Sequence, residues 1–202
     1  HTALAPSGQP IWIDMARRSA KALMALAERG ISVRDILSDA SIRNAMVVHA
    51  ACGGSTNLLL HVPAIAFSAG LQRPTVKDWI DVNREVPRFV SVLPNGPVQH
   101  PTVRVFLAGG VPEIMLHLRK LGLLDLDAMT VTGRSLGESL DWWEASDRRS
   151  RVREILRRRD RIDPDEVIIP PAEARRQGLS STVCFPIGNL CPQGSVLKAT
   201  AI

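Results

Sequence analysis

Two consecutive glycines interrupt the most apolar part of this chain and constrain its fold. They stand at positions 53–54, after an alanine-rich run with helical spacing and before three small polar residues at 55–57 and a second apolar run. Glycine ends helices readily, whereas Ser, Thr and Asn are preferred where helices begin. The stretch "ACGGSTNLLLHVPAIA" therefore predicts one helix that ends at the glycines, a turn, and a buried helix over residues 57–69.

Apolar residues recur at helical spacing over most of the chain. Near its end they alternate with polar residues instead. Two short strands are expected in "FVSVLPNGP", which closes in a Pro/Gly turn, and in "AMTVTG". After Pro170 and Pro171 the sequence alternates and is rich in Val, Thr and turn residues, which is typical of strands. The other predicted helices are residues 11–29, a short helix from Ser32, a helix capped by Ser41, residues 75–86 capped by Thr75 with Asp78, a helix from near Pro112 to Gly122, and a helix from Ser135 or Leu136 through Trp143.

This pattern predicts an α/β fold class: the mostly helical end of an α/β/α domain, followed by the first strands of a β-barrel-like domain. The expected division is residues 1–146 for the α/β part, 147–170 for a basic connector and 171–202 for the start of the β-rich part. Both ends of the 202-residue chain read as cut, as in an internal segment of a longer protein.

The excess of positive over negative charge in the chain is confined to one segment. "DRRSRVREILRRRDR" (147–161) holds eight arginines and three acidic residues, and the remainder has 17 basic and 17 acidic residues. A solvated basic helix or linker is the expected interpretation, because neither aromatic residues nor a nucleic-acid-binding motif accompany the run. No apolar run is long enough for a membrane span and no signal segment opens the chain, so we expect a cytoplasmic protein that binds neither nucleic acid nor membrane.

Cys52, Cys184 and Cys191 are too few and too scattered for a disulfide framework or a zinc site, and we expect buried, inert thiols.

The turn after the glycines is more informative. Backbone N–H groups and short polar side chains at the start of a helix suit an anion or a polyhydroxylated ligand. The alternative is that Ser55, Thr56 and Asn57 only cap the helix.

Several motifs occur together in a particular order: "GGSTN" with a histidine four positions later, "AGGVPEIM", "MTVTGRSLGESL" and "GNLCPQGSVLKATAI". In this order and spacing the chain resembles the dihydroxy-acid dehydratase and phosphogluconate dehydratase family. "HTALAPSGQPIW", "VLPNGPVQHPTVRVFLAGGVPE" and "LDWWEAS" resemble most the branch that dehydrates D-xylonate and similar aldonates. Phe106 stands where the branched-chain amino-acid enzymes carry a histidine, which also favours an aldonate.

The resemblance implies a lyase of sugar-acid metabolism that removes water from a 2,3-dihydroxy acid to give a 2-keto-3-deoxy acid. It implies an iron–sulfur cluster and Mg²⁺ in the full-length enzyme, with their ligands outside this segment, and a homodimer or homotetramer. No catalytic or metal-binding residue is therefore expected here, and the segment alone is expected to be inactive. Cys52 and Cys191 lie where the family carries other residues, so neither is expected to function.

The resemblance makes Ser55, Thr56, Asn57 and His61 the candidate substrate-binding residues. His61 follows Asn57 by one helical turn, although a lone histidine in an apolar helix is more often a core residue. His49 and His117 are expected to be structural, and His100 lies in a turn-rich loop where it is a weaker candidate. The alternatives are a dihydroxy-acid or 6-phosphogluconate dehydratase, a non-catalytic remnant with a structural role, or a basic module that binds polyanions.

Overall fold

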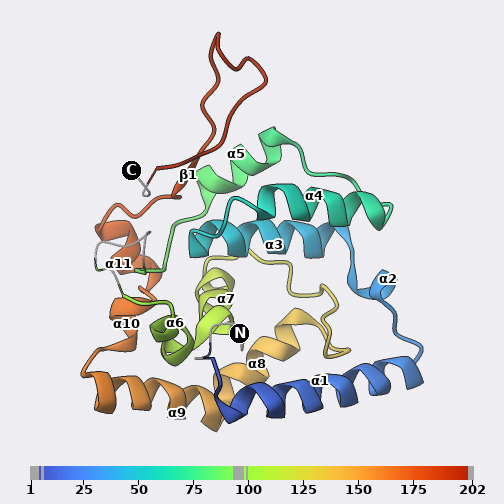
Figure 1. Ribbon diagram of the computed structural model, residues 1–202, viewed down its shortest axis with the longest axis vertical. Helices are drawn as coiled ribbons and strands as arrows, with labels where there is room; N and C mark the ends of the chain where they lie inside the picture. Colours follow the sequence, from blue (N-terminus) through green and yellow to red (C-terminus); the bar gives the residue numbers. More distant parts are fainter. Residues whose placement is uncertain (1–4, 6, 93–97, 99, 200–202) are drawn as a thin grey trace.

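The computed structural model describes residue 5, residues 7–92, residue 98 and residues 100–199. Figure 1 shows a mostly helical body from which a long hairpin projects near the C-terminal end. The turn predicted around residues 94–97 lies outside the described residues. The first half of the body contains α1 (Pro10–Glu28), α2 (Val33–Ile36), α3 (Asp39–Cys52), α4 (Leu58–Ser68) and α5 (Val76–Glu85).

The second half contains shorter elements and the sheet. They are α6 (Val103–Ala108), α7 (Gly110–Lys120), α8 (Leu136–Ala145), α9 (Asp147–Ile155), the π-helical turn η2 (Leu156–Asp160), α10 (Pro164–Val167), α11 (Pro171–Arg176), β1 (Val183–Cys184) and β2 (Leu197–Lys198). The two strands pair antiparallel. A mostly helical α/β chain with strands near its end is the predicted fold class, whereas the predicted division at residues 146 and 170 stays a prediction.

Helix α3 is the centre of the body. It packs against α4, α5 and α7, and α7 in turn contacts α6 and α8. The buried side chains of α3 lie along its length, with Val47 and Ala51 fully enclosed. This helix ends at Gly53, which adopts the left-handed conformation (φ 61°, ψ 48°) that the glycine pair predicts. The core therefore fixes the position of the turn between α3 and α4.

The capping signals are confirmed in part. Thr75 and Ser135 each form a capping box with the acidic residue three positions on, as the sequence predicts for Thr75. The predicted cap at Ser41 is wrong, because α3 begins at Asp39 and its N-cap is Ser38. The Ser38 hydroxyl accepts from the Ser41 backbone N–H (3.1 Å) and Ser41 Oγ accepts from the Ser38 N–H (2.9 Å), so Ser41 is the second half of the box.

The two strands expected before residue 135 are single bridges instead. Val90 pairs with Ile168 and Val92 with His100, while Met129 pairs only with Ser135. The stretch after Met129 turns at Gly133, whose amide donates to the Thr130 carbonyl at 2.9 Å. Within the part of the chain that the structure describes, each stretch meets its partner at isolated residue pairs, and β-propensity alone does not extend them into a sheet.

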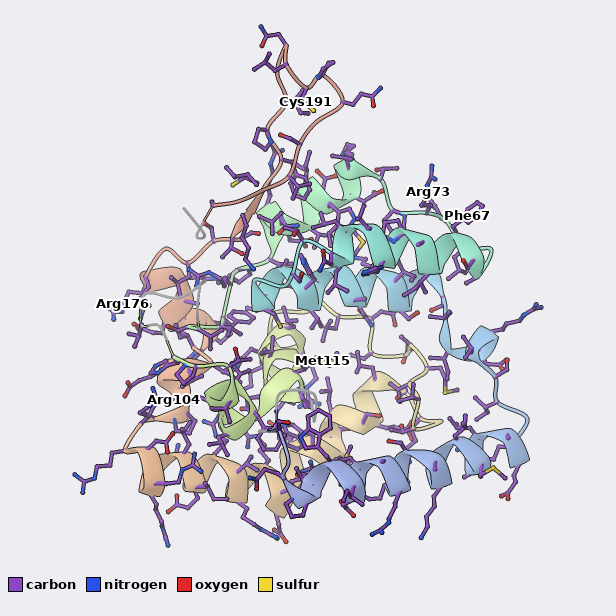
Figure 2. All side chains as sticks on the ribbon, in the orientation of Figure 1. Phe67, Arg73, Arg104, Met115, Arg176 and Cys191 are labelled. Atoms are coloured by element: carbon purple, nitrogen blue, oxygen red, sulfur yellow. The ribbon has the colours of Figure 1, made fainter. Side chains whose placement is uncertain are left out.

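Helix α4 is apolar but mostly exposed, which corrects the expectation of a buried helix. Only Val62 and Ala66 are buried, and they face α3. Leu60 and Phe67 are 73% and 72% exposed, and Figure 2 shows Phe67 pointing outward from the far end of the helix. Within the described residues nothing covers this face of α4.

The basic segment is not simply solvated, because it surrounds a buried carboxylate. Glu113 on α7 has a side chain that is only 3% exposed. Arg149 of α9 donates to both of its carboxylate oxygens at 2.7 Å. Arg153 lies 3.5 Å from the same carboxylate and also donates to the Ala108 carbonyl and to Asp165. These pairs attach α9 to α6, α7 and α10.

None of the described helices combines the length and the apolar character that a bilayer crossing requires.

Replacing Glu113 is expected to destabilise the fold strongly. Glu113→Ala leaves two arginines near an apolar interior without their carboxylate, which typically costs about 3–5 kcal/mol of unfolding free energy. The measurement is urea denaturation of the protein. The matched control is Glu144→Ala, which removes a half-exposed carboxylate paired with Arg119 and is expected to cost about 1 kcal/mol or less. Equal losses in the two variants would contradict a structural role for the buried pair.

The pH dependence of the unfolding free energy supplies a second readout of the role of Glu113. Burial raises the pKa of Glu113, but the hydrogen bond from Arg149 and the charges of Arg153 and Arg149 outweigh it and lower the pKa below its ordinary value. The stabilisation is therefore present above the ordinary glutamate pKa and is lost as the pH falls through the folded-state pKa. The stability difference between the natural protein and Glu113→Gln is expected to narrow as the pH falls from about 7 to about 3.

Candidate functional site

The GGSTN turn (residues 53–57) connects the end of α3 to the start of α4. The Gly53 and Gly54 N–H groups donate to Ala50 and His49, which closes α3. Asn57 stands at the first position before α4, but its backbone is helical and its side chain makes no capping hydrogen bond. The turn therefore reverses the chain within a few residues. Its polar side chains lie just before the first residue of the apolar helix α4.

Two side chains hold the backbone of this turn. The ammonium of Lys198 on β2 donates to the Gly53 carbonyl at 3.1 Å and to the Gly54 carbonyl at 3.3 Å. His49 Nε2 donates to the next carbonyl, that of Ser55, at 2.9 Å. Three consecutive carbonyl groups thus have side-chain donors, so the orientation of their peptide planes is fixed.

The close approach of His49 explains the second glycine. A Cβ on residue 54 would collide with the His49 imidazole ring. That ring is buried and packs edge-on against Trp79, with ring centroids 5.2 Å apart, so it has little room to move away. Burial and the Lys198 charge lower the pKa of His49 and outweigh the opposing effect of its hydrogen bond to Ser55, which favours the neutral ring.

The candidate side chains lie on the outside of the turn. Ser55 and Asn57 are exposed and Thr56 is half-buried. Ser55 Oγ accepts only a long bond, 3.3 Å, from the Asn57 N–H. Among the described residues no hydrogen bond involves the side chain of Thr56 or Asn57. Helix capping therefore leaves the Asn57 amide and the Thr56 hydroxyl available for a ligand.

His61 is exposed and does not belong to the core, so the usual interpretation of a lone histidine in an apolar helix is wrong here. It lines a groove between α4 and α2, together with Leu37, Ile65 and Leu71. None of the residues that line this groove belongs to the GGSTN turn. The structure thus brings Ser55, Thr56 and Asn57 together and places His61 on a neighbouring surface of the same helix.

A mostly apolar pocket of about 430 Å³ adjoins the turn. His49, Cys52, Gly54 and Leu58 line it from the turn side, and α7 and residues 128–136 close it. A sugar acid carries hydroxyls and a carboxylate that need hydrogen-bond partners, so this pocket does not suit it. The outer face of the turn is the better candidate surface for a polar ligand.

The described residues do not fit a metal or cluster site. They contain no group of three or more His, Cys, Asp or Glu side chains that could hold a metal ion. Burial raises the pKa of the Cys52 thiol to about 12, which disfavours the thiolate that a metal binds. Cys184 and Cys191 are exposed, which corrects the expectation that all three are buried, and Figure 2 shows Cys191 in the projecting hairpin.

Two residues at this site, His49 and Lys198, hold the turn through contacts that local sequence patterns do not predict. His49 was expected to be structural, and it is buried, but it also holds the turn. Lys198 is the single charged residue after Arg176, a signal that could have singled it out. His100 and His117 are buried; His100 lies against Arg104, 3.0 Å from its guanidinium, and His117 against Phe89.

Comparison with known proteins gives one family. The model of the dihydroxy-acid/6-phosphogluconate dehydratase N-terminal domain matches residues 1–139. D-xylonate dehydratase YagF of Escherichia coli (strain K12) is 66% identical over 202 residues, which is all of this chain and 31% of that protein. D-xylonate dehydratase YjhG of the same organism is 61% identical over the same shares.

More distant relatives carry a different name. Dihydroxy-acid dehydratase of Dinoroseobacter shibae is 37% identical over 180 residues, 89% of this chain and 28% of that protein. The chain thus spans less than a third of the length of these three relatives.

Substituting Gly54 tests the construction of the turn. Gly54→Ala is expected to lower the unfolding free energy by about 1–3 kcal/mol, because the new methyl group displaces the His49 ring. Gly188→Ala is the matched control, since a Cβ there meets no atom within 4 Å. Thermal denaturation of both variants measures the difference. An unchanged melting temperature in Gly54→Ala would show that His49 is not held as described.

Proposed function

Because the chain belongs to the dihydroxy-acid/6-phosphogluconate dehydratase family, we propose that it is an internal segment of a sugar-acid dehydratase that acts on an aldonate such as D-xylonate. The observation that carries this choice is the difference in identity between two groups of relatives. Those named D-xylonate dehydratases are 61–66% identical, whereas one named dihydroxy-acid dehydratase is 37% identical. The proposed protein is a cytoplasmic homodimer or homotetramer.

The proposed reaction is the loss of water from C2 and C3 of the acid. The C2 proton leaves to a base and the C3 hydroxyl leaves as water, which gives an enol that tautomerises to the 2-keto-3-deoxy acid. An iron–sulfur cluster and Mg²⁺ would supply Lewis acid chemistry for this step. The described residues do not fit either group, so the proposal assigns their ligands to parts of the full-length enzyme outside this chain.

This chain would contribute to substrate binding. The hydroxyls of Ser55 and Thr56 and the amide of Asn57 can each donate and accept hydrogen bonds, which suits the hydroxyl groups of an aldonate. The backbone of the turn is held by His49 and Lys198. Ligand binding would therefore not carry the entropic cost of ordering the turn. His61, exposed one turn further along α4, would extend this surface.

The proposal is tested by assaying the full-length protein that contains this chain. Three candidate substrates are supplied in parallel, and the keto acid formed from each is measured. They are D-xylonate, 6-phosphogluconate and a third compound, a 2,3-dihydroxy acid with a branched alkyl chain. We expect kcat/KM to be highest for D-xylonate and the isolated chain to be inactive. Preference for the branched dihydroxy acid or for the phosphorylated acid would indicate one of the alternative dehydratases, and no turnover of any of the three would favour a non-catalytic remnant.

Asn57→Ala tests the role of the turn in that enzyme. Loss of one polar contact with the substrate is expected to lower kcat/KM for D-xylonate tenfold or more, equivalent to about 1.4 kcal/mol. The melting temperature is expected to stay nearly unchanged, because the Asn57 side chain makes no capping bond. Ser68→Ala, at the far end of α4, is the control. A loss of about 1 kcal/mol of stability with unchanged kinetics would show that Asn57 only caps the helix.

A further inference from the structure

Lys198 connects two parts of the chain that are 144 residues apart. It is the only charged residue in the 26 residues after Arg176, and it lies on β2. Figure 1 shows the hairpin of β1 and β2 beside α5, on the side where α3 ends. From there the half-buried Lys198 ammonium reaches the carbonyls of Gly53 and Gly54.

The position of β2 that makes this contact possible is well defined. Val183 pairs with Lys198 and Cys184 with Leu197 in the antiparallel sheet. The Ala199 N–H donates to the carbonyl of Thr182, a buried residue, at 2.8 Å. The sheet thereby fixes the backbone of Lys198, and its side chain extends to the turn.

The carbonyls that Lys198 binds lie directly after Cys52, the last residue of α3. The last carbonyl groups of a helix have no partner within the helix, and together they form the negative end of its dipole. A half-buried ammonium there replaces water as the donor and opposes the partial negative charge. Among the described residues the Lys198 ammonium forms no ion pair with a carboxylate, and its hydrogen bonds go to the backbone of the turn.

We infer that Lys198 is a positioning residue for the substrate-binding turn. It acts through the peptide groups of Gly53 and Gly54, which immediately precede Ser55, Thr56 and Asn57, and it does not need to touch the substrate. This inference rests on the proposed function for its consequence in catalysis. The contact itself is independent of which acid is bound.

A positioning role differs from a merely structural one in what it changes. If Lys198 holds the turn in its binding-competent conformation, its loss reduces the fraction of enzyme that is competent, and the apparent affinity for substrate falls by that fraction. The amides of the turn would also exchange with solvent faster. A residue that only stabilised the fold would lower the melting temperature and leave KM and local exchange in the folded enzyme unchanged.

The experiment compares three variants of the full-length enzyme. Lys198→Met removes the ammonium but keeps the length of the side chain, and Lys198→Arg keeps a cationic donor. Lys77→Met is the matched control, because Lys77 is an exposed lysine on α5 that pairs with Asp81 at the surface. For each variant the kcat and KM for D-xylonate, the melting temperature and the hydrogen exchange of the peptide covering residues 53–58 are measured.

We expect Lys198→Met to raise KM at least tenfold and to speed hydrogen exchange in residues 53–58. Lys198→Arg is expected to restore most of the natural KM and most of the natural exchange rate. Lys77→Met is expected to match the natural enzyme in both. Unchanged KM and unchanged exchange in Lys198→Met would overturn the inference. If the natural enzyme does not dehydrate an aldonate, the proposed function fails, and the exchange data alone decide the role of Lys198. If Lys198→Met does not fold, Lys198→Gln is measured in the same way, and a natural KM and exchange in it would overturn the inference.

Discussion

The left-handed turn at Gly53 is the constraint on which the candidate site depends. It ends α3 at the centre of the body and is followed by three successive carbonyl groups, those of Gly53, Gly54 and Ser55, that accept side-chain hydrogen bonds. The donors come from opposite directions in the sequence: His49 belongs to α3 itself and Lys198 to β2. Because the backbone is held from the inside, the polar side chains of the turn are directed outward, where a polyhydroxylated ligand could reach them.

A second constraint fixes the surroundings of α3. Glu113 is buried at the first turn of α7, and a buried carboxylate is tolerated only with compensating charge and hydrogen bonds. Arg149 and Arg153 supply both, so the basic segment is attached to the helical body at this point. The Gly109–Gly110 pair at the start of α7 belongs to the same arrangement, since a Cβ at Gly109 would collide with the Glu113 side chain.

Local signals in the sequence predict much of the fold, and contacts between distant residues explain what they miss. The helix end at Gly53 and the capping box at Thr75 depend on neighbouring residues, so both could be predicted. The exposure of α4 could not, because an apolar helix gives no information about which parts of a protein cover it. The roles of Glu113 and Lys198 depend on partners 36 and 144 or more residues away, which periodicity cannot reveal.

We propose that the outer face of the GGSTN turn binds the sugar acid in the full-length enzyme. A crystal structure of that enzyme with a bound aldonate or its keto-acid product tests this most directly. We expect ligand oxygens within about 3 Å of the Asn57 amide and of a Ser55 or Thr56 hydroxyl, with Lys198 and His49 still bound to the carbonyls beneath. A ligand bound elsewhere, with these side chains covered by another part of the protein, would contradict it.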